Sequence, residues 1–412
     1  MMARGALEGV RITDFTWVWA GPYATLLLAF MGAQVIKVES LRSLDTARVQ
    51  SITTGQRFDH PDESTVFLNL NLNKLGVRLN LSKPGAVELA RQLIKVSDVV
   101  TQNMRPGTLE RFGLGYEAAR ELRPDIVYLS SSAFGSTGPF WNYAGYAPGF
   151  AAFSGIAQIC GYPDGPPNTM SGATDLMSAA NSAFAVLAAL NYRARTGQGQ
   201  HIDLSSPESL SVLIGDMLMD YTMNRRIQGR MGNRDSIMAP HNVYRCQPFL
   251  GKDQGEDRWI SIAVATDEEW QALCRVLGYP EWAQDPRFAD AYSRWQHQEE
   301  IDRHLGRWAA DHTPYEAMEI FQKAGVAAAP SMSAQDLFTD PHLRERGFSS
   351  EVEHPVVGRK TVIGPPWKLS QTPALVSGPS PLLGEHNRYV FGDILGLNYE
   401  EIARLEQEGI LY

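Results

Sequence analysis

Asp175 stands out in this 412-residue chain because no other charged residue lies between Asp164 and Arg193. A turn of small residues precedes it, and a segment with apolar residues at helical spacing follows it. The chain from 126 to 163 is also uncharged and rich in Gly, Ala and Ser. A solitary carboxylate in such surroundings has either a structural or a chemical role.

The structural interpretation is a helix cap. Thr174 or Asp175 would accept backbone N–H bonds from a helix that begins at Leu176, as isolated aspartates before helices usually do. The chemical interpretation uses the same geometry, since the helix dipole and free N–H groups hold a carboxylate in place. Such a carboxylate could act as a nucleophile with oxyanion stabilisation nearby.

The segments that must position Asp175 alternate between strand and helix. Apolar and β-branched runs predict strands, and longer periodic segments with Pro near their starts and Gly near the end of one predict helices. The expected strands are 10–15, 34–39, 98–103 and 125–131, and the expected helices are 22–33 and 82–97. This alternation predicts an α/β fold, a doubly wound parallel sheet with ligands at the carboxyl ends of its strands.

The pattern changes after residue 205. A Met-rich helix, "LIGDMLMDYTM", is followed by a loop rich in Gly, Arg and Asn. Beyond it we expect a strand at 259–266, a capping box formed by Thr266 and Glu269, and helices near 293–310 and 314–325. These elements predict a smaller α+β region, followed by a return segment with prolines and a C-terminal amphipathic helix.

Composition excludes several classes of function. A formal charge of −9 argues against a nucleic-acid partner, and the three cysteines lack zinc or disulfide spacing, which predicts a reducing cytoplasm. The chain has no P-loop, no GxGxxG after a strand, no GxSxG and no HExxH, so nucleotide fingerprints and a metal site are not expected. The uncharged stretch 16–36 contains Gly and Pro, so we interpret it as core and not as a membrane span.

Blocks along nearly the whole chain resemble one family. They are, in order, "LEGVRITDFTWVWAGPYATLLLAFMGAQVIKVE", "LNLNKLGVRLNL", "NMRPGTLERFGLGYE", "SAFGSTGP", "GPPNTMSGATD", "LAALNYRARTGQGQHIDLS", "GNRDSIMAPHNVYRC" and "LGEHN". The likeness is to the class III CoA-transferases, which include formyl-CoA:oxalate and carnitine CoA-transferases and the α-methylacyl-CoA racemases.

The resemblance implies a domain organisation and an assembly. It implies a Rossmann-like large CoA-binding domain built from both chain ends, a small α+β domain and two chains interlocked like links. The partner would be an identical chain or a paralogous subunit. The implied bounds are 1–205 and 340–412 for the large domain, 206–225 for a linker helix, 226–330 for the small domain and 331–339 for a return linker.

The resemblance also implies a mechanism. Asp175 would attack an acyl-CoA thioester to form an anhydride, and the released thiolate would convert this to an aspartyl-CoA thioester. CoA would then pass to an acceptor acid, with no metal, no redox cofactor and no tightly bound cofactor. A carboxylate suits this role because each intermediate stays as activated as a thioester, whereas a serine ester would be an energetic sink.

The resemblance implies which residues of this chain contact CoA and substrate, because they stand at the positions of the family's contact residues. In "VWAG", Trp19 stands where formyl-CoA transferase has glutamine. For the charged positions, a solvated surface charge is the alternative interpretation. The implied contacts are Trp19, Ala20, Arg42, Leu72, Lys74, Asn103, Met104, Arg111, Phe112 and Tyr146.

Two departures from the family bear on the reaction. Where the racemases carry a His-Asp pair, this chain has Tyr146 and Ala147, which favours a transferase over a racemase or epimerase. Some transferases place a helper glutamate at the position of Ala147, and "RIQGRMGNRD" lacks the tetraglycine lid of formyl-CoA transferase. A catalytically silent CoA-binding subunit is the alternative from another class, and an intact Asp175 argues against it.

The acceptor is predicted from aromatic residues in the blocks that line the family's active site, namely Trp17, Trp19, Tyr146 and Phe150, together with Met170. Large rings there favour a bulky or aryl acid such as 2-benzylsuccinate, with succinyl-CoA as donor. The alternative is that these rings pack the pantetheine arm or the core and leave a small-acid pocket.

Overall fold

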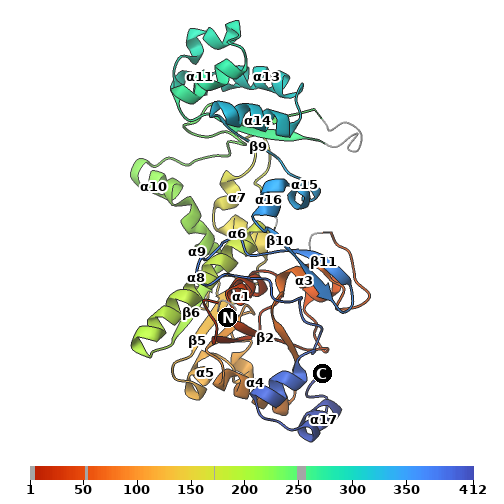
Figure 1. Ribbon diagram of the computed structural model, residues 1–412. Helices are drawn as coiled ribbons and strands as arrows, with labels where there is room; N and C mark the ends of the chain where they lie inside the picture. Colours follow the sequence, from red (N-terminus) through yellow and green to blue (C-terminus); the bar gives the residue numbers. More distant parts are fainter. Residues whose placement is uncertain (1–4, 52–53, 171, 248–256) are drawn as a thin grey trace. The chain divides into compact units, whose positions relative to one another are not determined.

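The computed structural model describes residues 5–51, 54–170, 172–247 and 257–412 (Figure 1). The chain forms two compact units. The large unit comprises Met1–Ala157, Thr169–Ile227 and Pro341–Tyr412, and the small unit comprises Gln158–Asn168 and Gln228–Asp340. The C-terminal segment therefore completes the large unit. The domain and linker bounds expected from the resemblance stay predictions.

A six-stranded sheet forms the centre of the large unit. Its strands are β1 (Arg11–Asp14), β2 (Gln34–Glu39), β3 (Leu75–Arg78), β4 (Val99–Gln102), β5 (Val127–Ser132) and β6 (Gln200–Ser205). The order is β3-β2-β1-β4-β5-β6 and every pairing is parallel, which confirms the predicted doubly wound α/β sheet. The chain order reverses between β1 and β4, and this switch point is where such sheets bind ligands.

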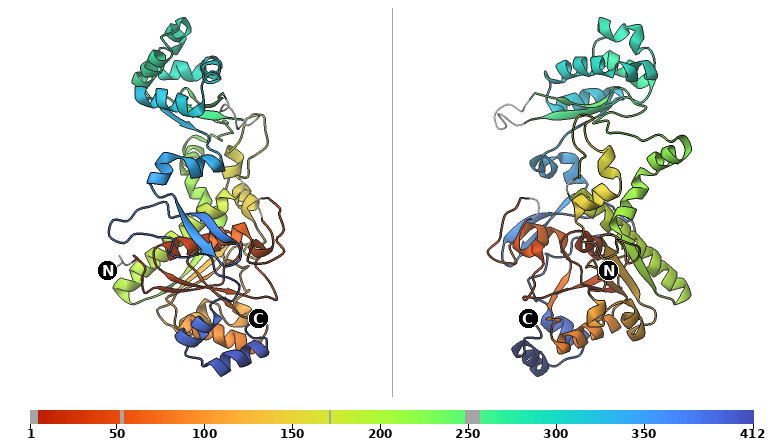
Figure 2. Two further views of the ribbon diagram at one scale, coloured as in Figure 1. Left: turned by 45° about the vertical axis from the view of Figure 1, so that its right-hand side comes forward. Right: turned by 180° about the vertical axis from the view of Figure 1, so that it is seen from behind.

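Helices cover both faces of this sheet. On one face, α1 (Ala20–Phe30) and α8 (Ala173–Thr196) pack against apolar side chains of β1, β4 and β5. On the other face lie α4 (Pro84–Lys95), α5 (Tyr116–Leu122) and, from the C-terminal segment, η5 (Arg388–Ile394) and α17 (Tyr399–Gln407). Figure 2 shows α17 beside α4, although the two are far apart in the sequence.

Two apolar helices of the large unit, α1 and α8, are candidates for a membrane span by composition. The stretch 16–36 contains the buried helix α1 and the start of the strand β2, which confirms that it is core. Within the described residues, α8 is the one helix long and apolar enough to cross a membrane by length and composition. Ala179, Ala183 and Val186 of α8 are buried against the sheet, so α8 is a core helix of this unit.

Shorter elements complete the large unit and its connections. The Met-rich helix is confirmed as α10, but a separate helix α9 precedes it. These elements are α2 (Thr46–Val49), α3 (Thr65–Leu70), η1 (Glu110–Phe112), α6 (Ala147–Phe153), α7 (Ile156–Ile159), α9 (Ser206–Ser211), η2 (Val212–Ile214), α10 (Gly215–Asn224), α16 (Pro341–Glu345), β10 (Ser349–His354) and β11 (Gly358–Ile363).

The small unit has its own antiparallel sheet and core. The sheet order is β7-β8-β9, and the predicted capping box of Thr266 and Glu269 is present. The helix expected near 293–310 is instead two helices, because the backbone at His297 leaves the helical region. The elements are β7 (His241–Arg245), β8 (Trp259–Ala263), β9 (Ala327–Pro330), α11 (Asp267–Val276), η3 (Glu281–Gln284), η4 (Pro286–Phe288), α12 (Ala291–Gln296), α13 (Gln298–Ala309), α14 (Pro314–Ala324) and α15 (Ala334–Thr339).

Candidate active site

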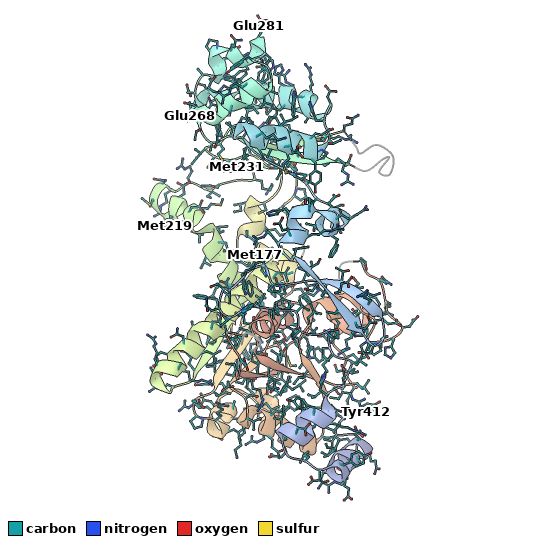
Figure 3. All side chains as sticks on the ribbon, in the orientation of Figure 1. Met177, Met219, Met231, Glu268, Glu281 and Tyr412 are labelled. Atoms are coloured by element: carbon teal, nitrogen blue, oxygen red, sulfur yellow. The ribbon has the colours of Figure 1, made fainter. Side chains whose placement is uncertain are left out.

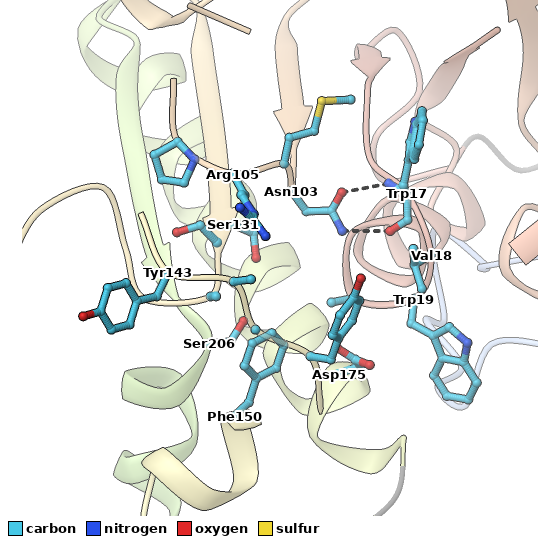
Figure 4. A pocket seen from close by; sticks show the side chains of 18 residues that line it. Trp17, Val18, Trp19, Asn103, Arg105, Ser131, Tyr143, Phe150, Asp175 and Ser206 are labelled. Carbon is cyan, nitrogen blue, oxygen red and sulfur yellow. Dashed lines mark hydrogen bonds between the residues drawn. The ribbon is translucent and has the colours of Figure 1, made fainter. Parts of the chain in front are cut away.

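A pocket of about 250 Å³ lies at the carboxyl ends of the central strands of the large unit (Figure 4). We call it the Asp175 pocket. Segments that follow β1, β4 and β5 contribute to its wall, together with the start of α8. Its lining includes Trp17, Val18, Trp19, Ala20, Asn103, Met104, Arg105, Ser131, Ser132, Tyr143, Tyr146, Phe150, Asp175 and Ser206. The pocket therefore lies where the sheet topology predicts a ligand.

Asp175 lies in the first turn of α8 and does not cap it. The helix begins at Ala173 and not at Leu176, and no side chain makes a capping bond at Gly172. Thr174 is buried and its hydroxyl donates to the carbonyl oxygen of Ala147 at 3.1 Å. The cap interpretation is therefore wrong, because the helix starts earlier than its apolar pattern indicates and turns Asp175 toward the pocket.

The carboxylate of Asp175 is partly buried and has no hydrogen-bond or ion-pair partner among the described residues. Burial raises its pKa to about 6. At neutral pH the carboxylate is mostly ionised, yet the described part of the chain supplies no hydrogen-bond donor to stabilise its charge. An ionised group in this condition is a stronger nucleophile than a solvated carboxylate.

The loop after β1 faces Asp175 and is fixed by side chains from neighbouring elements. Asn103, at the end of β4, accepts from the backbone N–H of Trp17 at 2.7 Å and donates to its carbonyl at 2.8 Å (Figure 4). Asp45 accepts from the backbone N–H of Val18 at 3.1 Å. Val18 has φ +69°, a region that costs a β-branched residue about 1–3 kcal/mol. These hydrogen bonds hold the loop in a conformation it would not adopt alone.

Buried charges lie beneath this loop. Asp14 is fully buried and accepts from the backbone N–H of Thr16 at 2.9 Å, and the ammonium of Lys37 donates to the Thr16 carbonyl at 2.7 Å. Lys74 lies 3.4 Å from Asp14. Burial alone would raise the pKa of Asp14, but Lys74, Lys37 and hydroxyl donors outweigh it and lower that pKa. Lys37, a charged residue between the apolar Ile36 and Val38 of β2, was the sequence signal for this cluster.

A second pocket, of about 320 Å³, adjoins the first. We call it the Arg42 pocket. Trp17 and Met104 line both pockets, so the two pockets share part of their walls. The Arg42 pocket is also lined by Phe15, Val38, Glu39, Ser40, Arg42, Ser43, Leu79, Asn80, Leu81, Ser82, Leu109 and Phe112.

The structure brings most of the predicted site residues together. Trp19, Ala20, Asn103, Met104, Tyr146 and Asp175 line the Asp175 pocket, and Arg42, Met104 and Phe112 line the Arg42 pocket. Three others line neither pocket. Arg111 is exposed in η1, Leu72 is buried in the core beneath α1, and Lys74 is 3% exposed with its ammonium enclosed by Asp14, Thr25, Asn71 and the Pro22 carbonyl.

The aromatic residues divide between the pocket and the core. Trp19 packs with the cluster formed by Ala47, Val66 and Leu70, and its ring leaves no room for a Cβ at Gly172. Tyr146 is 76% exposed. Phe150 is buried and lies so close to Gly145 that a Cβ there would meet its ring at 2.7 Å. Met170 is not among the residues that line the described pockets.

Sequence reasoning missed several lining residues, namely Arg105, Ser131, Ser132 and Ser206. Arg105 stands two residues after Asn103, and the serines end β5 or begin α9. Polar residues that follow parallel strands were the available signal. In the described part of the chain no group of His, Cys, Asp and Glu side chains could hold a metal ion.

Residues 7–387 match CoA-transferase family III. The chain is 32% identical over 406 residues to a succinyl-CoA–D-citramalate CoA-transferase of Chloroflexus aurantiacus, covering 98% of each protein. It is 31% identical over 410 residues to the beta subunit of a succinyl-CoA–L-malate CoA-transferase of the same organism, again covering 98% of each. A crystal structure of a CAIB/BAIF family protein from Brucella suis superposes with a TM-score of 0.82 at 27% identity, covering 95% of this chain and all of that one. The chain belongs to CoA-transferase family III and is an enzyme whose substrates are CoA thioesters.

Proposed function

We propose that this enzyme transfers CoA from succinyl-CoA to a second carboxylic acid, with Asp175 as covalent nucleophile. One observation carries the proposal: the unpaired carboxylate of Asp175 and the side chain of Arg42 line two adjoining pockets that share Trp17 and Met104. A CoA thioester needs this arrangement, since its reactive carbonyl and its phosphates are at opposite ends of a long arm. The names of the two Chloroflexus relatives support succinyl-CoA as donor.

The proposed reaction proceeds through intermediates of similar energy. The Asp175 carboxylate attacks the thioester carbonyl, the C–S bond breaks, and an anhydride and a CoA thiolate form. The thiolate attacks the aspartyl carbonyl and releases the donor acid, which leaves an aspartyl-CoA thioester. The acceptor carboxylate displaces CoA to form a new anhydride, and the thiolate attacks the acceptor carbonyl and regenerates Asp175. The first backbone N–H groups of α1, where Ala20 lines the pocket, are suited to stabilise the oxyanion.

Trapping the intermediate tests this proposal. The enzyme is incubated with succinyl-CoA and then treated with borohydride, which reduces an aspartyl thioester to an alcohol. We expect loss of activity and a mass change confined to the peptide that contains Asp175. Treatment without succinyl-CoA is the control. An unmodified Asp175 in a fully inactivated enzyme would contradict the mechanism.

The raised pKa of Asp175 predicts a pH dependence. Only the ionised carboxylate attacks the thioester, so the rate of transfer should rise about tenfold per pH unit below pH 6 and level off above it. The measurement is kcat between pH 5 and 8 at saturating substrates and constant ionic strength. A rate that is constant from pH 5 to pH 7 would show that ionisation of Asp175 does not limit transfer.

Two acceptor classes compete. An aryl acid such as 2-benzylsuccinate is favoured by Trp17, Tyr143 and Tyr146 in the pocket wall, and burying its ring would contribute roughly 2–3 kcal/mol. Small dicarboxylates are favoured by the names of the relatives. Comparing kcat/KM for 2-benzylsuccinate, D-citramalate, oxalate and carnitine decides between them. A preference for any acid other than 2-benzylsuccinate would exclude the aryl acceptor and leave CoA transfer intact.

A racemase or epimerase is the alternative reaction. It requires a base beside the α-carbon, and Tyr146 and Ala147 stand where the racemases carry histidine and aspartate. The side chain of Tyr146 is exposed at the pocket, and that of Ala147 has no titratable group. Incubation of a chiral 2-methylacyl-CoA in D₂O distinguishes the two, and deuterium incorporation at the rate of turnover would support the racemase.

The interlocked dimer stays a prediction, supported by apolar side chains left exposed on α8, η2 and α10. Figure 3 shows Met219 projecting from α10. The exposed residues include Phe184, Val212, Leu218, Met219 and Met223. The beta-subunit relative also makes a paralogous partner chain a candidate. A folded monomer at nanomolar concentration in analytical ultracentrifugation would exclude an obligate assembly.

A further inference from the structure

Arg105 lies in the loop after β4 and lines the Asp175 pocket. Of the described residues in that lining, Arg105 is the only cation and Asp175 the only anion. In Figure 4 the side chain of Arg105 lies across the pocket from Asp175. The pocket thus has one group suited to attack a carbonyl and, on the other wall, one group suited to bind an anion.

The guanidinium of Arg105 is exposed, and within the described chain it makes no hydrogen bond or ion pair. Two arginines of the same unit, Arg48 and Arg123, are by contrast paired. Arg48 bonds Glu39 at 2.7 Å, and Arg123 bonds Asp98 at 2.7 Å. The donors of Arg105 are therefore available to a ligand, and its planar fork suits a carboxylate.

A hydroxyl group without a partner lies in the same pocket. Ser132 ends β5 and is 5% exposed, and its Oγ has no hydrogen-bond partner among the residues that the structure describes. Leaving a buried hydroxyl unpaired is unfavourable, and a ligand oxygen that accepts from it removes this cost. A guanidinium and a hydroxyl that line one pocket can both donate to a carboxylate.

The charges in the pocket indicate which carboxylate of the substrate Arg105 would bind. The reacting carbonyl must contact Asp175, so the anion at the opposite wall is a second group of the same acid. A dicarboxylate entering the pocket would be repelled by ionised Asp175 unless a cation offset the charge. The CoA phosphates are the other anions of the substrate, but Arg105 does not line the Arg42 pocket.

We propose that Arg105, assisted by the Ser132 hydroxyl, binds the second carboxylate of dicarboxylic acyl groups and so makes the enzyme specific for dicarboxylic acids. This inference rests on CoA transfer at Asp175. Arg105 is a specificity-determining residue here, and it takes no part in bond making. Both the donor succinyl group and a dicarboxylate acceptor would use the same contact in turn.

The test compares acceptors of equal length with and without the second carboxylate, namely succinate against butyrate and glutarate against valerate. We expect the wild type to prefer the dicarboxylate. Arg105→Gln should lower the ratio of kcat/KM for dicarboxylate over monocarboxylate by about 10- to 100-fold, and Arg105→Lys by less. Arg42→Gln is the matched control and should leave this ratio unchanged, because Arg42 lines the other pocket.

Several results would overturn the inference: a wild type without preference for dicarboxylates, or an Arg105→Gln variant whose loss is equal for both acids of a pair. A binding measurement separates this outcome from failure of the proposed function. In the Asp175→Asn background, succinyl-CoA should bind more tightly than butyryl-CoA, and Arg105→Gln should remove that difference. Equal binding of the two thioesters before Arg105 is changed would exclude the contact, whether or not the wild type transfers CoA.

Discussion

Replacing Asp175 by Asn is expected to abolish CoA transfer, with kcat reduced by at least roughly 10⁴-fold, since loss of a covalent nucleophile has effects of this order. An amide cannot form the anhydride on which every later step depends. The side chain makes no hydrogen bond to the described residues, so the substitution removes no structural contact. The measurement is transfer from succinyl-CoA followed by chromatography of the acyl-CoA products.

Controls separate chemistry from folding. Asp164→Asn is the same chemical change at an exposed aspartate outside the pocket and should leave kcat within about twofold, as surface substitutions usually do. Because burial raises the folded-state pKa of Asp175, its contribution to stability is present below the unfolded pKa and is lost as pH rises through about 6. The Asn variant should therefore unfold at no lower temperature than wild type at pH 7. Near-normal turnover in both Asp175→Asn and Asp175→Ala would contradict the assignment of Asp175 as the covalent nucleophile.

Replacing Lys74 by Met is expected to lower the free energy of unfolding by about 3–5 kcal/mol, because breaking a buried ion pair leaves an uncompensated charge. Lys74 and Asp14 are both buried, and the Lys74 ammonium also donates to the Pro22 carbonyl and the Asn71 side chain. The measurement is the denaturant midpoint and slope of the cooperative transition. Lys95→Met, an exposed lysine at the end of α4, is the control and should change stability by less than about 0.5 kcal/mol.

A double variant tests whether Asp14 and Lys74 stabilise the protein as an ion pair. Asp14→Asn combined with Lys74→Met removes both charges, so its loss of stability should be smaller than the sum of the two single losses. The resemblance to the family instead implies that Lys74 contacts CoA. Under that interpretation Lys74→Met would raise KM for the thioester and leave stability unchanged, and this result would contradict the structural role.

The sequence by itself determined the fold class and the central candidate for chemistry. Strand and helix alternate with local periods, and such patterns depend on neighbours a few residues apart. Four of the six parallel strands (β1, β2, β4 and β5) and the helices α1, α4 and α8 could therefore be predicted, whereas β3 and β6 were not. Asp175 was identifiable because an isolated charge in an uncharged segment is visible without a structure. The resemblance added the family, because its motifs run in order along the chain.

Only the tertiary structure decided which charges are buried and which face the pocket. Lys74 and Arg105 are both cations near strand ends, and no local pattern separates them. Lys74 is enclosed because β3 lies two strands from the switch point and its loop packs under α1, whereas Arg105 follows β4 at the switch point itself. Burial and pairing depend on contacts between segments tens of residues apart, and sequence periodicity does not encode these contacts.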